Sequence, residues 1–167
     1  DINLIDYEYI NLFQLGMTQR QFFTKTININ YNYIFILNID HQISYCNLIK
    51  YLISSNLDIV SPMILGKKNT MFSNFWGDID ENGYYKRSFN YLNIIKKKEI
   101  GFWCVPYISG SILVSKNKYS ELLQLLNNNE MTEDICDFDM YLSRIIREHY
   151  NFMYISNFYD FGCILDD

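Results

Sequence analysis

Hydrophobic and polar positions follow two patterns in the first half of this chain. Residues 31–40, YNYIFILNID, form a short and almost continuous apolar run that ends in polar side chains. Such a run is typical of a strand buried on both faces, and we expect it to be the central strand of a sheet. Residues 47–56 have apolar positions at helical spacing, and DIVSPMI, residues 58–64, predicts a second strand that ends at Pro62. This order of strand, helix and strand indicates a βαβ unit.

The same alternation continues in the second half of the chain. Residues 111–114 predict a strand, residues 118–129 and 139–150 predict amphipathic helices, and residues 152–156 predict a closing strand. We therefore predict one α/β domain over residues 1–167, with a mainly parallel central sheet flanked by helices.

Composition and charge restrict the class of protein. The 167 residues are 49% hydrophobic and 20% charged, which indicates a globular chain. A formal net charge of -5 disfavours nucleic acid as the partner. No apolar run reaches the ~20 residues of a membrane-spanning helix, and the N-terminus does not have the pattern of a signal peptide. Because the chain does not begin with Met, we expect a fragment or a processed form.

The amino-acid composition indicates the kind of organism from which the chain comes. The chain has no Ala and is rich in Asn, Ile, Tyr and Lys, whose codons are rich in A and T. This bias is typical of a parasite or a large DNA virus.

The cysteines are widely separated and form no C-x-x-C pair, so we predict buried thiols and no zinc site. They are Cys46, Cys104, Cys136 and Cys163.

Asp40 is the first candidate for a functional residue. It ends the predicted strand of residues 31–40, and ligands of α/β sheets bind beyond the carboxyl ends of the strands. With Asn38 and His41 beside it, Asp40 could help to bind a divalent cation that clamps a diphosphate. Alternatively, Asp40 caps the next helix or turn.

The acidic stretch TEDICDFDM, residues 132–140, is the second candidate. Acids at the start of a helix are favoured by the helix dipole, which alone would explain them. Asp139, with Asp137 nearby, could instead act as a general base that deprotonates an attacking hydroxyl. No G-x-S-x-G elbow and no glycine-rich phosphate loop occurs in the chain, so a nucleophilic triad and a P-loop are not supported.

An aromatic and cationic set is the third candidate. Such side chains stack on sugars or bases, although 17% aromatic residues also suit a packed aromatic core. The set consists of Trp76, Tyr84, Tyr85, Arg87 and Trp103.

From about Tyr31 to its end, the chain carries a series of motifs in a fixed order. It resembles the middle domain of collagen lysyl hydroxylases and the collagen galactosyltransferases. The matching pieces are Asn38-Ile39-Asp40 at a D-x-D position, Ser61-Pro62-Met63, SNFWG (residues 73–77), GYYKRS (83–88), GFWCVPYIS (101–109) and DFDM (137–140).

This resemblance implies a GT-A-type, Rossmann-like fold that binds UDP-glucose or UDP-galactose. Mn²⁺ would be held at Asn38 and Asp40 and bridge to the diphosphate, while Asp139, beside Asp137, would activate the acceptor hydroxyl. The acceptor implied is hydroxylysine or galactosyl-hydroxylysine of a collagen-like polypeptide. Substrate contacts would come from Asn74, Trp76, Tyr84, Tyr85, Arg87 and Trp103. The compartment would be the host cytoplasm or the virion for a viral member and the endoplasmic reticulum lumen for a cellular one.

Two departures from the family pattern leave an alternative. Asn38 replaces the first acid of D-x-D, which removes one charge from the metal site. Only about 37 residues precede that position, so we expect part of the nucleotide-binding half to be missing or supplied by a partner chain. The alternative is a catalytically inactive accessory module, which could bind a partner or pair with itself as a homodimer.

Overall fold

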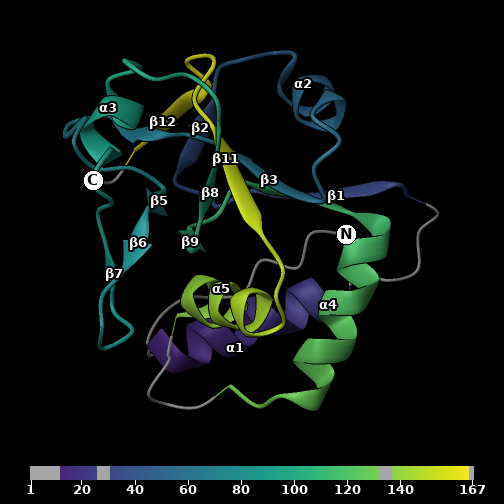
Figure 1. Cartoon of the computed structure of the whole chain (residues 1–167). Coiled ribbons are helices and arrows are strands. Elements are labelled where there is room, and N and C mark those ends of the chain that lie inside the picture. The colour runs from purple at the N-terminus through teal and green to yellow at the C-terminus, as the bar shows by residue number, and fades with distance from the viewer. Residues whose placement is uncertain (1–11, 26–30, 132–136, 166–167) are drawn as a thin grey trace.

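A computed structural model of the chain describes residues 12–25, 31–131 and 137–165 (Figure 1). Its helices are α1 (Leu12–Lys25), α2 (Leu48–Ser54), α3 (Tyr91–Ile95), α4 (Lys116–Asn128) and α5 (Phe138–Glu148). The main sheet contains β1 (Tyr33–Ile36), β3 (Ile59–Pro62), β8 (Phe102–Val105), β10 (Ile112–Ser115) and β11 (Met153–Ser156). Smaller pairings join β2 (His41–Ile43), β12 (Gly162–Ile164) and β4 (Leu65–Gly66), β5 (Phe75–Trp76) and β9 (Tyr107–Ile108), and β6 (Asp78–Ile79) and β7 (Tyr85–Lys86).

The main sheet is mixed, which corrects the prediction of a mainly parallel sheet. Its order is β1-β10-β3-β11-β8, and only β3 and β11 pair in parallel. Strand β10 lies between β1 and β3 and runs antiparallel to both. The strand-helix-strand unit is present, but a later strand separates its two strands. The order of the elements along the chain does not indicate that β10 inserts between β1 and β3.

Strand β1 is an edge strand and not the central one that its apolar run indicated. Its four residues are half-buried and alternate between the two faces of the sheet. Ile34 and Ile36 pack against the larger core cluster, and Tyr33 and Phe35 pack against the smaller one. An apolar run therefore reported correctly that both faces are covered, but it carries no information on the strand's neighbours.

Helices cover both faces of the main sheet and divide the core in two. In Figure 1, α1, α4 and α5 lie below the sheet and α2 lies above it. The alternation of strand side chains supplies both layers: Ile112 and Val114 of β10 belong to the larger cluster, and Leu113 belongs to the smaller one with Leu52 of α2. Within the described residues, no helix is both long enough and apolar enough to span a membrane.

The cysteines differ from the prediction of buried thiols. Cys46 and Cys104 are exposed, Cys163 is half-buried, and all three are free. Cys46 precedes α2 and Cys104 lies on the edge strand β8, so neither reaches a core layer. Cys136 lies outside the described residues.

One end of the main sheet gathers the turns that carry the candidate residues. Strands β1, β3 and β11 run in the same direction, so their carboxyl ends meet at this end of the sheet. The antiparallel strand β10 begins there, directly after the Ser109-Gly110 turn. Ligands of α/β sheets bind at such an end.

Candidate functional site at the sheet end and the neighbouring pocket

Asp139 lies in the first turn of α5 and points to the turn that precedes β10. Its Oδ2 accepts hydrogen bonds from the Gly110 backbone N–H at 2.9 Å and from the Ser109 hydroxyl at 3.1 Å. One turn further along α5, the buried Ser143 hydroxyl accepts from the Ile108 N–H at 3.5 Å. One face of α5 is thus fixed against residues 108–110, which places the Asp139 carboxylate at the carboxyl end of the sheet.

Asn38 reaches the same turn from the end of β1. Gly110 has φ +53°, and a Cβ at Gly110 would lie 2.5 Å from Asn38 Cγ. Only glycine therefore lets the Asn38 side chain pack this closely on the turn. The fold brings together Asn38 and Asp139, two predicted site residues about a hundred positions apart.

The environment of Asp139 suits a base that works near neutral pH. Burial, and next the negative charge of Asp137, raise the pKa of the Asp139 carboxyl to about 6. Hydrogen bonds from Gly110, Ser109 and Asn38 oppose this rise because they stabilise the charged form. The carboxylate is then ionised at pH 7 but still basic enough to accept a proton.

Asp137 caps α5, as the helix-start interpretation predicted. Its Oδ1 accepts a hydrogen bond from the Met140 N–H at 2.9 Å, and its backbone is extended, as an N-cap requires. The cap accounts for an acid at this position, and Asp137 also lines the pocket described below.

Asp40, the predicted metal ligand, lies between Asn38 and His41 in sequence and has a partly exposed side chain. Its side chain is 37% exposed, and its Oδ1 lies 4.0 Å from His41 Nε2. His41 is buried and pairs its Nδ1 with the Ser111 hydroxyl at 2.6 Å, and burial lowers its pKa despite the charge of Asp40. The described residues contain no cluster of three or more His, Cys, Asp or Glu side chains that could hold a metal ion. The predicted donors at this position are thus one carboxylate and the Asn38 amide.

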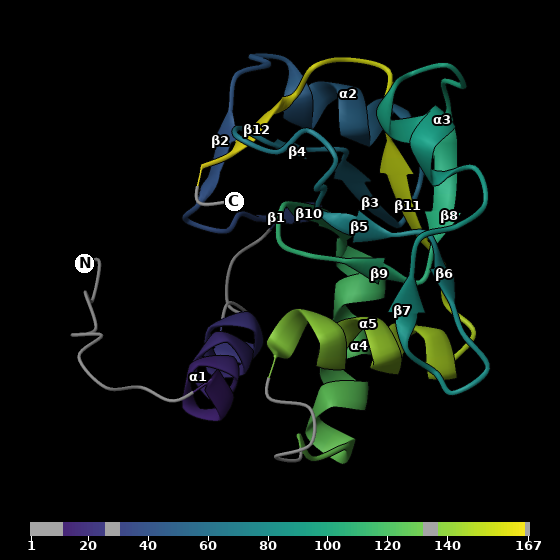
Figure 2. The same ribbon diagram turned by 90° about the vertical axis from the view of Figure 1, so that its left-hand side faces the viewer.

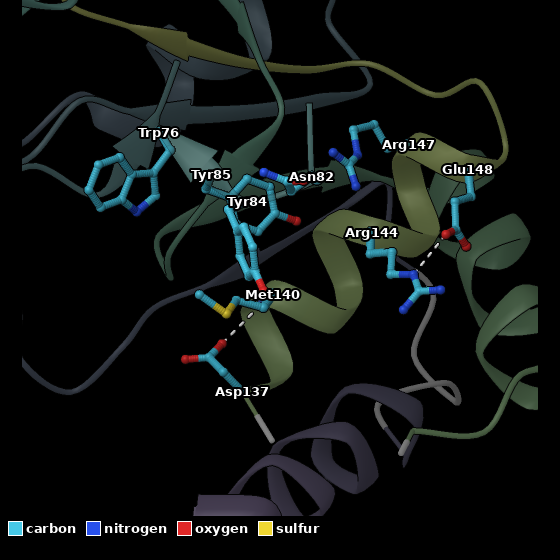
Figure 3. A pocket seen from close by; sticks show the side chains of 10 residues that line it. Trp76, Asn82, Tyr84, Tyr85, Asp137, Met140, Arg144, Arg147 and Glu148 are labelled. Atoms are coloured by element: carbon cyan, nitrogen blue, oxygen red, sulfur yellow. Dashed lines mark hydrogen bonds and ion pairs between the residues drawn. The ribbon is translucent and has the colours of Figure 1, made fainter. Parts of the chain in front are cut away.

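A pocket of about 640 Å³ lies beside the first turn of α5. The β6–β7 turn and β7 form one wall, and α5 forms the other (Figure 3). In the ribbon of Figure 2, the hairpin of β6 and β7 lies beside α5. In Figure 3, Tyr84 and Tyr85 lie between Trp76 on one side and the two arginines of α5 on the other. The lining consists of Trp76, Asn82, Gly83, Tyr84, Tyr85, Asp137, Met140, Arg144, Arg147 and Glu148.

Contacts with a second ring and with a guanidinium group hold the Tyr85 ring of this pocket in place. The Tyr85 ring lies 4.9 Å from the Tyr107 ring, and the Arg147 guanidinium lies over Tyr85 at 5.5 Å from the ring centroid. Arg144 pairs with Glu148, Nε to Oε1, at 2.7 Å. Within the described part of the chain, Arg147 forms no ion pair. The pocket thus has one aromatic ring that is held by its neighbours and one cation that forms no ion pair with the described residues.

The other predicted contact residues lie away from the pocket. Asn74 is 1% exposed, accepts from Ile64 N–H at 2.8 Å and donates to the Ser61 hydroxyl and the Pro62 carbonyl. Its side chain thus fixes the end of β3. Trp103 is half-buried in β8, where its indole N–H donates to Asn157 Oδ1 at 3.2 Å.

Arg87 is exposed and supports a neighbouring loop. Its Nη2 donates to the Met71 carbonyl at 3.0 Å, and its guanidinium lies 4.9 Å from the Tyr91 ring centroid. Of the aromatic and cationic set, the structure therefore gathers Trp76, Tyr84 and Tyr85 in one pocket and separates Arg87 and Trp103 from it.

Sequence reasoning missed several residues of the site. Ser109 and Gly110 stood in the VPYISG stretch, but only the fold shows that they hold Asp139. The sequence did not indicate that Arg144 and Arg147 line a pocket, because helical spacing cannot show that a hairpin faces that side. Asn157 is fully buried and bonds Gly101, Trp103, Ile94 and Glu99. A polar residue directly after an apolar strand was its only signal.

A model of the N-terminal domain of glycosyltransferase family 25 matches residues 6–166. The chain belongs to glycosyltransferase family 25. This match confirms the resemblance drawn from the ordered motifs, and it covers the sheet end, the Asp139 turn and the pocket.

Similar members of the family are parts of much longer proteins. A procollagen lysyl hydroxylase and glycosyltransferase of Acanthamoeba polyphaga mimivirus is 36% identical over 136 residues, which are 81% of this chain and 15% of that protein. A multifunctional procollagen lysine hydroxylase and glycosyltransferase of Caenorhabditis elegans is 33% identical over 144 residues, 83% of this chain and 19% of that protein. Human procollagen-lysine,2-oxoglutarate 5-dioxygenase 2 is 36% identical over 135 residues, which are 80% of this chain and 18% of that protein. The family 25 chain thus spans less than a fifth of these relatives.

Proposed function

We propose that this family 25 domain transfers a glucosyl or galactosyl group from a UDP-sugar to a hydroxylysine or galactosyl-hydroxylysine of a collagen-like polypeptide. The observation that carries the proposal is the convergence of Asp139, Asn38 and the Ser109-Gly110 turn at the carboxyl end of the sheet. The names of the similar proteins, procollagen hydroxylases and glycosyltransferases, support the substrate class.

Asp139 is the general base of the proposed reaction. The carboxylate would accept the proton of the acceptor hydroxyl as that oxygen bonds to the sugar carbon and UDP departs. Ser109 and Gly110 hold one carboxylate oxygen, which fixes the orientation of the group that would receive the proton. Burial keeps its pKa close enough to neutral for this transfer.

A divalent metal would bind at Asp40, with the Asn38 amide as a neutral second ligand. Bound Mn²⁺ supplies charge that offsets the negative charge of the departing diphosphate. In this proposal the domain has the GT-A-type arrangement, in which the donor lies at the carboxyl end of the sheet. The neutral ligand at position 38 weakens the site compared with two carboxylates.

The alternative function is an inactive accessory or self-pairing module in a collagen-modifying protein. Asn38 favours it, because a neutral amide stands at the position of the first acid of D-x-D. The two functions differ in a single property, which is binding of the donor nucleotide.

Calorimetry with UDP, with and without Mn²⁺, tests the choice. We expect Mn²⁺-dependent binding by the wild type, loss of that binding in Asp40→Ala, and no change in Asp78→Ala, which removes an exposed acid paired with Lys86. In a transfer assay, Asp139→Asn should keep UDP binding and lower the rate by about 10² to 10⁴. No UDP binding together with stoichiometric self-association would overturn the enzyme and support the accessory module.

A further inference from the structure

The side chain of Asn38 contacts the proposed base. A Cβ at Gly110 would lie 2.5 Å from Asn38 Cγ and 2.6 Å from Asn38 Nδ2, so the amide end of Asn38 packs on the turn that holds Asp139. The amide also donates a hydrogen bond to the Asp139 carboxylate. Ser109 and Gly110 donate to the same group. Asp139 on α5 therefore receives hydrogen bonds from two further segments of the chain.

The backbone on both sides of Asn38 is fixed independently of Asp139. Before Asn38, strand β1 pairs with β10 along its whole length. After Asn38, the His41 N–H donates to the Asn38 carbonyl at 3.1 Å and closes a tight turn. The buried His41 side chain pairs its Nδ1 with the Ser111 hydroxyl at 2.6 Å. The Asn38 amide is thus brought to the turn before β10 by the fold, and it can hold Asp139 from there.

The turn that faces Asn38 has an unfavourable backbone conformation. Gly110 has φ +53° and Ser111, which is not a glycine, has φ +41°. A non-glycine residue keeps such a conformation only where its surroundings fix it. Here the Ser111 hydroxyl pairs with His41, and the Gly110 N–H points at the Asp139 carboxylate. Such residues cluster at functional sites, which supports a role for the orientation of this carboxylate.

An amide and a carboxylate at position 38 would act differently on Asp139. The amide supplies an N–H donor, whereas an ionised carboxylate of nearly the same shape can only accept. An aspartate at this position would therefore remove one donor from the Asp139 carboxylate. It would also place a second negative charge against Asp139, in addition to the charge of Asp137. The neutral residue at the first position of D-x-D is thus the one that can hold the proposed base.

We propose that Asn38 is a positioning residue for Asp139, and that its amide N–H, which a carboxylate would not supply, holds the base in the orientation that receives the proton of the acceptor hydroxyl. The catalytic part of this inference rests on the proposed function, whereas the coupling of the two side chains does not. Because the hydrogen bond uses the amide N–H, it leaves the amide oxygen for the metal role proposed above. Asn38 then belongs to an active arrangement and does not indicate a degenerate one.

A cycle of nearly isosteric variants tests the coupling without any substrate. Asn38→Asp removes the donor and adds a charge, so we expect it to lower the urea midpoint of the wild type at pH 7. In the Asp139→Asn background, the same change exchanges donor and acceptor and restores the hydrogen bond. The midpoint should then fall much less, or rise. Equal shifts in the two backgrounds would show that the side chains are not coupled and would overturn the proposal.

Transfer rates and UDP binding separate positioning from a general loss of structure. We expect Asn38→Asp to lower kcat about tenfold to hundredfold, because the base loses its orientation. Its binding of UDP with Mn²⁺ should not weaken, since a carboxylate oxygen is at least as good a ligand as an amide oxygen. Asn32→Asp adds the same charge at an exposed side chain before β1, and as the control it should change neither quantity.

The outcomes distinguish this inference from the proposed function. Transfer by the wild type with an equal or higher kcat in Asn38→Asp would refute the role of Asn38 and leave the proposed function standing. A coupled stability cycle with neither transfer nor UDP binding by the wild type would overturn the proposed function, and with it the catalytic meaning of the contact.

Discussion

Asp139 shows how one side chain can be both a helix-start acid and a candidate base. The acidic stretch was identifiable in the sequence, and so was the alternative that the acids only serve the helix dipole. The structure separates the two acids: Asp137 caps α5, and Asp139 turns inward to Ser109 and Gly110. Sequence spacing could not show this, because the partners lie about 30 residues away.

The raised pKa of Asp139 predicts a specific pH dependence of stability. A carboxyl with pKa about 6 in the folded state and 3.8 as its ordinary value binds more protons folded than unfolded between these values. Its contribution to the free energy of unfolding is therefore present below pH 4 and is lost as the pH rises through 6. We expect urea unfolding to show that the wild type loses about 2 kcal/mol relative to Asp139→Asn between pH 4 and pH 7. Parallel pH profiles of the two proteins would contradict this assignment.

At the scale of elements, the turn before β10 decides the geometry of the sheet end. Gly110→Ala adds a methyl group against Asn38 at a residue with φ +53°, whereas Gly83 has φ +89° and nothing within 4 Å. Both changes place alanine in a left-handed conformation, and only the first creates a clash. We expect Gly110→Ala to lower the free energy of unfolding by about 1 to 3 kcal/mol more than Gly83→Ala. Equal losses would show that the close packing of Asn38 does not matter for stability.

The predicted helices agree with the structure where hydrophobic residues recur at helical spacing. The helices expected at 47–56, 118–129 and 139–150 became α2, α4 and α5, with ends displaced by a few residues. The pairing of the strands could not be predicted in the same way. The hydrophobic pattern of a strand shows which of its faces are covered, but not which strand lies beside it. The hairpin of β6 and β7 was not predicted, because each of its strands is only two residues long.

At the scale of the whole molecule, the two core clusters share the same strands, so we expect them to unfold together. Leu52 belongs to the smaller cluster and Leu126 to the larger one, and both are fully buried. Each Leu→Ala change should cost about 2 to 5 kcal/mol and leave one transition that circular dichroism and tryptophan fluorescence report together. Leu92→Ala, at a side chain that is 44% exposed, serves as the control and should have a small effect. Two separated transitions in either core variant would contradict a single domain.

The sequence by itself determined the family, the alternation of helices and strands, and the acidic and aromatic residues of the candidate site. These are encoded locally or in the order of motifs along the chain, and the match to family 25 confirmed that order. Tertiary structure alone decided the mixed strand order, the contact of Asn38 with the Asp139 turn, and the pocket that unites the hairpin with the arginines of α5. The reason is physical: hydrophobic period fixes which side of an element is buried, and only packing of distant segments fixes what it is buried against.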